Sequence, residues 1–91
     1  MKSENVILIE ECCSYYSIET SFVHTLNEYG LIELEQKNTA WFIHHDQLAQ
    51  LEKYMHLHYD LDINVEGIEA INHLLEKIEQ LQEEIRTMKT L

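Results

Sequence analysis

Proline is absent from the 91 residues, and glycine occurs only twice, at Gly30 and Gly67. Linkers between domains are usually marked by these residues or by serine-rich stretches, and no such segment occurs here. Repeats and low-complexity stretches are missing as well. The chain is therefore expected to form one compact unit, with a body over residues 1–63 and a long helical segment over residues 64–91.

Basic residues are also scarce. Six Lys and Arg stand against 17 Asp and Glu, the formal net charge is −11, and only Lys2 and Lys37 precede residue 46. Affinity for nucleic acids comes largely from Lys and Arg that neutralise phosphates, and anionic membrane surfaces attract the same residues. This composition argues against direct DNA binding and against membrane binding. It favours a basic protein surface as the partner.

Long apolar runs are lacking too. No stretch approaches the roughly 18 residues of a membrane span, and residues 1–5 lack the basic-then-apolar pattern of a signal peptide. We therefore expect a cytoplasmic protein.

Cys12 and Cys13 are the only cysteines, and neighbours in sequence are poorly placed for a stabilising disulfide. In a reducing compartment we expect packed, reduced thiols rather than a redox or metal pair.

Motifs for catalysis and metal binding are not evident. The chain has no Gly-rich phosphate loop, and the one conceivable catalytic pair is Cys12 or Cys13 with His24. None of the six histidines follows a His-x-x-x-His or Cys-x-x-Cys spacing. We expect histidines that lie at the surface or form hydrogen bonds, and no catalytic residue, cofactor or metal ion.

The first 30 residues predict two helices. An apolar run over residues 6–9 leads into a short helix in which every third or fourth position is apolar, namely Ile9, Cys12, Cys13 and Tyr16. A turn at residues 17–18 separates it from a second helix over residues 19–29. Gly30 is placed to end that helix, as glycine often does just past a C-terminus.

A small hairpin is predicted next. Residues 31–34 alternate as in a strand, residues 36–39 are typical of a turn, and residues 40–43 are aromatic and β-branched. Trp41, Phe42 and Ile43 cannot all face the core, because side chains alternate along a strand. Either one of these aromatics is exposed as an anchor for a partner, or a neighbouring chain's long helix covers all three.

The second half predicts two more helices. Asp46 is a candidate N-cap for a third helix that ends near Tyr59, and Asn64 is a candidate N-cap for the last one. From Val65 onward apolar residues recur at spacings of three and four, which gives about three heptads. A helix of about 25 residues is close to 38 Å long. Its first apolar turns, from Ile68 to Leu75, are expected to fold back on the body.

The order of these elements resembles the MerR-type winged helix, and the local match runs from residue 9 to residue 75. In that family the second helix typically presents an Arg-x-x-Arg-Tyr-Tyr segment to DNA. This chain has residues 21–26, Ser-Phe-Val-His-Thr-Leu, at that place, so neither arginine is present. The wing carries Glu33 and Glu35 where a DNA-binding wing would be basic.

A narrower resemblance covers nearly the whole chain. It is similar to the chaperone modulator family CbpM, an offshoot of the MerR type. Where a proline often follows the wing's acidic residue in the wider family, this chain has Leu34. The matching residues are Glu11 with Cys13, Ile18-Glu19, the Gly-Leu-Ile-Glu segment 30–33, Trp41, Asp46, the Ile-Asn-Val-Glu-Gly-Ile segment 63–68 and the run over residues 74–81.

The resemblance implies a mainly α fold, with a MerR-like winged helix-turn-helix, a two-stranded wing and a long coiled-coil-type C-terminal helix. It also implies a modulator that binds and restrains the J domain of a DnaJ-like co-chaperone of the CbpA type. An acidic domain can occupy the basic helical face that J domains carry, and charge complementarity would speed that encounter.

Two sets of residues are candidates for contact with other chains. The partner surface is expected on the acidic residues of the first two helices and the wing, together with two wing aromatics: Glu10, Glu11, Glu19, Glu28, Glu33, Glu35, Trp41 and Phe42. A solvated acidic face that keeps the protein in solution is the competing interpretation. Homodimerisation is expected through the distal seam of the last helix, in parallel or antiparallel orientation: Ile78, Leu81, Ile85 and Met88.

Two other functions stay open at this stage. One is a transcription regulator of MerR type that binds DNA weakly or through a basic partner subunit. The other is a dimerisation adaptor with no link to chaperones. A gel-shift at low salt separates the first of these from the protein-binding readings, because phosphate contacts make DNA binding strongly dependent on salt.

Overall fold

The computed structural model describes residues 5–89, so residues 1–4 and 90–91 of the two predicted segments lie outside it. The fold is mainly helical, with a small antiparallel sheet. The elements in chain order are β1 (Val6–Leu8), α1 (Ile9–Tyr16), α2 (Thr20–Glu28), β2 (Leu34–Lys37), β3 (Ala40–His44), the 3-10 turn η2 (His45–Gln47), α3 (Leu48–Met55), the π-helical turn η3 (His56–Asp60) and α4 (Val65–Lys89).

The sheet has three strands in the order β1-β3-β2, so the prediction of a two-stranded wing was incomplete. Residues 6–8, expected as the lead-in to the first helix, pair instead with residues 42–44 of β3 in antiparallel register. A three-residue apolar segment has no periodicity that separates strand from helix. Pairing with β3 provides hydrogen-bond partners for backbone groups that would otherwise be left without them.

Both helices of the helix-turn-helix form as predicted, and each ends in a left-handed residue. After α1, Ser17 adopts φ 60° and ψ 47°, and the Ile18 N–H donates to the Cys13 carbonyl at 3.0 Å. After α2, Gly30 has φ 75°, and the Leu31 N–H donates to the Leu26 carbonyl at 2.9 Å. These are Schellman-type closures, which reverse the chain tightly after each helix.

The first wing strand was predicted too early. Residues 31–33 are not in a strand, because they still close the end of α2 and bury Ile32; β2 begins at Leu34. The wing turn is also shorter than the turn predicted over residues 36–39. Lys37 pairs with Ala40, which leaves two residues in the turn, and the first of them, Asn38, adopts φ 58°. Strand β3 is confirmed, with one residue more than expected.

The start of the third helix also differs from the prediction. Asp46 is not an N-cap, because it lies inside η2 and α3 begins only at Leu48, without a side-chain cap. The 3-10 turn has already fixed the direction of the chain before the α-helix starts. Helix α3 then widens into η3, which ends at Asp60, close to the predicted end. Asp62 in the left-handed region, with φ 62°, turns the chain towards α4.

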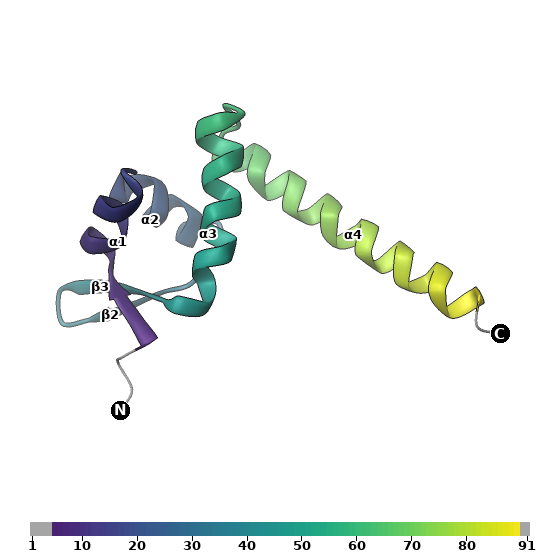
Figure 1. The fold of residues 1–91 in the computed structure, drawn as a ribbon, viewed down its shortest axis with the longest axis horizontal. Helices are drawn as coiled ribbons and strands as arrows, with labels where there is room; N and C mark the ends of the chain where they lie inside the picture. The colour runs from purple at the N-terminus through teal and green to yellow at the C-terminus, as the bar shows by residue number, and fades with distance from the viewer. Residues whose placement is uncertain (1–4, 90–91) are drawn as a thin grey trace.

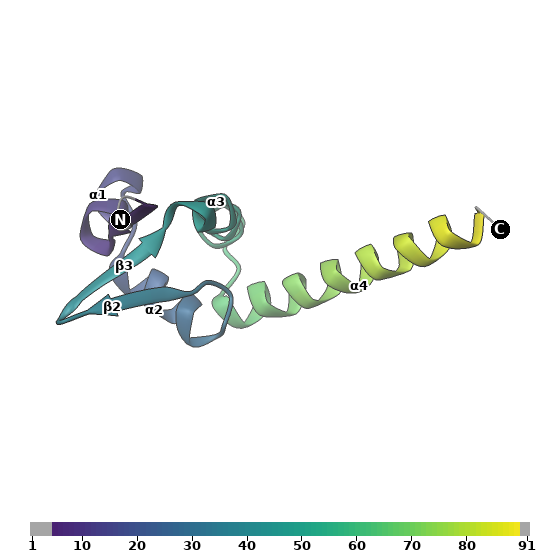
Figure 2. The same ribbon diagram turned by 90° about the horizontal axis from the view of Figure 1, so that it is seen from below.

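The long helix begins as predicted. The Gly67 N–H donates to Asn64 Oδ1 at 2.8 Å, which is the expected capping bond, and α4 runs for 25 residues. Only its first turns touch the body: Val65 and Ile68 are buried, and the rest projects away as a single rod (Figures 1 and 2). This projection gives the molecule its extents of 52 × 36 × 20 Å.

The hydrophobic core lies where α1, α2, α3, the sheet and the root of α4 meet. Its buried members come from every one of these elements, so that the helix-turn-helix and the wing share one core: Ile9, Cys12, Cys13, Phe22, Val23, Leu26, Ile32, Ile43, Leu51, Tyr54, Val65 and Ile68. No charged side chain in the described part of the chain is buried. The charges are therefore available at the surface.

Candidate functional site

The predicted acidic residues line the helix-turn-helix and the wing. Five of them are exposed and Glu35 is half-buried. They lie in the first turn of α1, just before and at the end of α2, and in the segment that enters and forms β2: Glu10, Glu11, Glu19, Glu28, Glu33 and Glu35. Neither α1 nor α2 contains a Lys or Arg, and Lys37 is the single one in residues 5–44. The surface is therefore strongly acidic at the place where the fold could present a recognition helix.

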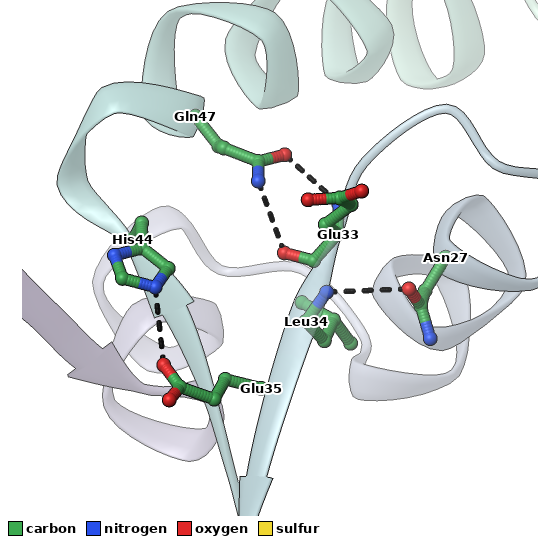
Figure 3. Close-up of polar contacts among 6 residues, drawn as sticks. All are labelled: Asn27, Glu33, Leu34, Glu35, His44 and Gln47. Carbon is green, nitrogen blue, oxygen red and sulfur yellow. Dashed lines mark hydrogen bonds and ion pairs between the residues drawn. The ribbon is translucent and has the colours of Figure 1, made fainter.

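Glu33 is held by side-chain amides from two other elements (Figure 3). Its backbone N–H donates to Gln47 Oε1 at 2.9 Å, and Gln47 Nε2 donates to the Glu33 carbonyl at 3.2 Å. The next N–H, that of Leu34, donates to Asn27 Oδ1 of α2 at 3.2 Å. These bonds fix the backbone at the start of the wing against α2 and η2, so the Glu33 side chain leaves the chain from a defined point of the surface.

Glu35 is less free than the other acidic residues. Its Oε1 lies 3.0 Å from His44 Nε2 on the neighbouring strand, a cross-strand contact also seen in Figure 3. Both side chains stay partly open to solvent. Such a pair contributes little to stability, but it orients Glu35 and occupies one of its carboxylate oxygens.

The wing aromatics face opposite sides of the sheet. Ile43 is fully buried, and Trp41, on the same side, is half-buried with its ring edge-on to His24 at a centroid distance of 5.2 Å. Phe42 lies on the other side, in register with Leu8 and Glu35, and is also half-buried. Neither predicted anchor is fully exposed. The chain itself covers part of Trp41, through His24 of α2.

The distal seam of α4 is open to solvent. Ile78, Leu81, Ile85 and Met88 are 47 %, 58 %, 54 % and 70 % exposed. The expectation that the helix folds back as far as Leu75 holds only in part: the Tyr54 hydroxyl donates to Asn72 Oδ1 at 3.4 Å, whereas Leu74 and Leu75 are exposed. Contiguous apolar surface of this kind is rare on a monomeric protein.

A groove between α1 and α3 was not expected from the sequence. A cavity of about 440 Å³ lies between Ile7, Tyr15 and Leu48, and a second of about 350 Å³ lies between Ile18, Met55 and neighbouring residues. Both are also lined by Tyr16 and Glu52. Residues that line one groove from positions so far apart in sequence share no local pattern, so no sequence signal pointed to it.

One hydrogen bond crosses this groove. The Tyr16 hydroxyl donates to Glu52 Oε2 at 2.7 Å. Partial burial and this bond to a carboxylate raise the pKa of Tyr16 to about 12, since both disfavour the phenolate. The Tyr16 hydroxyl therefore stays protonated at physiological pH, and as a hydrogen-bond donor it ties α1 to α3.

The two thiols are poorly suited to chemistry. Cys12 and Cys13 are free and buried. Burial raises the pKa of both, and that of Cys13 to about 11, so thiolate is scarce near neutral pH.

Within residues 5–89 no group of three His, Cys, Asp or Glu side chains is arranged to hold a metal ion. Over the same residues, no helix is both long and apolar enough to cross a bilayer.

The comparison with protein families agrees with the architecture. A family model described as MerR HTH family regulatory protein matches residues 7–90. Because the match spans most of the chain, the chain belongs to this family of regulatory proteins. No curated protein and no solved structure matches it significantly. The helix-turn-helix, the wing and the long last helix are consistent with this family.

Proposed function

We propose that this MerR-type domain is a non-enzymatic regulator that works by binding another protein, and that its partner is the J domain of a DnaJ/CbpA-like co-chaperone, which it restrains. The observation that carries the proposal is the charge of the helix-turn-helix: α1 and α2 contain acidic side chains and no Lys or Arg. A surface of this sign complements a basic helix and repels a nucleic acid.

The structure also supports a fixed rather than an adaptable surface. The amides of Gln47 and Asn27 hold the segment at Glu33, and the Tyr16–Glu52 bond holds α1 to α3. Acidic groups on a rigid frame keep their spacing, so less side-chain and backbone freedom is lost when a partner binds. Electrostatic attraction would set the rate of encounter, and apolar contacts would supply most of the affinity.

The chaperone connection comes from the resemblance to CbpM, which covers the helix-to-wing step at residues 30–33 and the start of the last helix at residues 63–68. The family match alone reaches only as far as a regulatory protein. In the proposed mechanism the acidic domain covers the basic face of the J domain, so that this face cannot dock on its Hsp70.

We further propose that the protein acts as a homodimer through α4. Its distal seam is unpaired in the single chain, and helices with Ile and Leu at alternating heptad positions associate through such seams. A dimer would carry two acidic domains, on the same end of the paired helices if they are parallel and on opposite ends if they are antiparallel. Two linked domains would raise the effective concentration of a second contact wherever two J domains lie close together.

A second candidate function is a DNA-binding regulator, which the MerR family match itself favours. It requires phosphate contacts that α1 and α2 do not offer, so a basic partner subunit would have to supply them. A gel-shift of the chain with duplex DNA at low salt tests this function. Tight binding with a steep salt dependence would overturn the charge reasoning above.

The proposed function is tested by a pull-down with the tagged full chain from lysate of the source cell, followed by mass spectrometry. We expect a DnaJ-like protein among the retained proteins, and we expect it to be lost when the wash contains high salt. Retention of a DNA-binding protein in its place would support the regulator-subunit function. When the chain is added to purified J domain and Hsp70, we expect the stimulation of Hsp70 by the J domain to fall, and unchanged stimulation would contradict the restraining role.

A further inference from the structure

We propose that the groove between α1 and α3 is the docking site for a basic amphipathic helix of a partner protein. This inference rests on the proposed function insofar as it takes a J domain as that partner. It differs in location, since the groove lies away from the acidic residues of α2 and the wing. Figure 2 shows α1 and α3 on one side of the body, and α2 and β2 on the other.

The groove consists of two recesses separated by the Tyr16–Glu52 hydrogen bond. The larger, of about 440 Å³, is bounded by β1, α1 and the start of α3. The smaller, of about 350 Å³, is bounded by the α1–α2 turn, the end of α3 and η3. Two successive recesses in one groove suit side chains that project from one face of a bound helix, at i and i+3, i+4 or i+7.

The larger recess has apolar walls and an aromatic rim. Ile7, Cys12 and Leu48 contribute its apolar surface. Tyr15 stands at its edge, 82 % exposed, with its ring edge-on to Tyr16 at a centroid distance of 5.1 Å. Exposed tyrosines beside an apolar recess are frequent centres of binding energy in interfaces, because they combine a large rigid contact area with a polar tip.

The charge of the lining selects the occupant. Glu11 and Glu52 line the larger recess and Asp60 lines the smaller, while neither is lined by a Lys or Arg. Asp60 already meets His56, whose Nδ1 lies 2.8 Å from Asp60 Oδ2, so Glu11 and Glu52 are the stronger sites for a partner's cation. Glu52 accepts one bond from Tyr16 and keeps further acceptor positions on its carboxylate. A helix with apolar residues flanked by Lys or Arg complements this lining.

The test measures binding of a fluorescently labelled J domain from a DnaJ-like protein of the source cell to the full chain. A labelled synthetic helix with Leu at i, i+4 and i+7 flanked by Lys is the second probe, and the same helix with Glu for Lys is its control. Tyr15→Ala and Glu11→Gln alter the groove at exposed positions. Glu79→Gln, at an exposed position on α4 away from both recesses, is the matched charge control.

We expect Tyr15→Ala to weaken binding of both probes about tenfold. Glu11→Gln should weaken binding less and flatten its salt dependence, while Glu79→Gln should bind like the unmodified chain and the Glu helix should not bind. If neither groove variant weakens binding of either probe, the groove is not the docking site.

The two proposals fail in different ways. If the J domain binds and Tyr15→Ala and Glu11→Gln leave its affinity unchanged, the groove inference is wrong while the proposed function stands. If the J domain does not bind and the Lys helix binds with the expected sensitivity to the variants, the groove inference stands and the proposed function is wrong. Absence of binding by both probes overturns both.

Discussion

The Tyr29 hydroxyl donates a 2.9 Å hydrogen bond to Glu66 Oε2, and this contact joins the end of α2 to the first turn of α4. It lies beside the two core residues through which α4 is anchored, Val65 and Ile68. One turn further along, the Tyr54 hydroxyl of α3 donates to Asn72 Oδ1 at 3.4 Å, so the direction of the projecting helix is set by contacts within its first two turns. If two chains paired along α4, these contacts would therefore fix how the two helix-turn-helix units lie relative to each other.

Replacing Tyr29 with Phe should change the titration of Glu66. The pKa of Glu66 is lowered first by its own backbone N–H, at the N-terminus of α4, and then by the Tyr29 hydroxyl. In Tyr29→Phe the pKa of Glu66 should rise but stay below its ordinary value, because the backbone contribution remains. A carboxyl-carbon NMR titration measures this. An unchanged pKa would show that the bond is not formed in solution.

The turn of the helix-turn-helix offers a stabilising substitution. Ser17 adopts φ 60°, a left-handed conformation that is strained for a residue with a side chain. Ser17→Gly should raise the free energy of unfolding by about 0.5–1 kcal/mol, since the relief of strain exceeds the entropy cost of glycine. Ser14→Gly, inside α1, is the matched control and should be destabilising. Urea denaturation compares the two, and a loss of stability in Ser17→Gly would contradict the assigned backbone.

Stability should fall at alkaline pH. The pKa values of Cys13 and Tyr16 are raised in the folded chain, from 9.0 to about 11 and from 10.0 to about 12, mainly by burial. The folded state thus favours the protonated forms. Their contribution is complete below the ordinary values and is lost as the pH rises through the raised ones, so the loss should begin near pH 9 and end near pH 12.

The Tyr16 part of this loss can be isolated. Tyr16→Phe should remove the decline between pH 10 and about pH 12, leaving that of the thiols. Urea midpoints measured across this range decide the matter. A profile that Tyr16→Phe leaves unaltered would mean that Tyr16 is not coupled to folding in this way.

Association through α4 should depend on the exposed seam. Ile78→Asp or Ile85→Asp places a charge where two apolar seams would meet, so we expect each to convert a dimer into a monomer. Gln80→Asp adds the same charge on an outer position of the helix and should leave the dimer intact. Light scattering gives the mass of each variant. Equal mass for the unmodified chain and both seam variants would exclude a dimer of this kind.

The elements whose signals lie in neighbouring residues of the sequence were predicted correctly. The heptads and the Asn64 cap located α4, Gly30 located the end of α2, and the aromatic, β-branched run located β3. Errors arose where tertiary contacts decide. Residues 6–8 form a strand because β3 lies beside them, and residues 31–33 lose their strand character because they close α2. Asp46 is displaced from the cap by a 3-10 turn.

The candidate site also has features that the sequence predicted and features that only tertiary packing determines. Charge and heptad positions indicated the acidic surface and the exposed seam, because both are properties of sequence. The groove between α1 and α3 could not be predicted, since Tyr16 and Glu52 meet only through the packing of two helices that lie on either side of the wing in the chain. The half-buried state of Trp41 likewise depends on His24 from another element.

The most direct test is a calorimetric titration of the purified chain with the J domain of a DnaJ-like protein from the source cell, and in parallel with a duplex DNA, both at low salt. We predict saturable binding of the J domain that weakens as salt is added, and no binding of the duplex. Tight binding of the duplex together with no heat from the J domain would contradict the central proposal and make the chain a DNA-binding regulator.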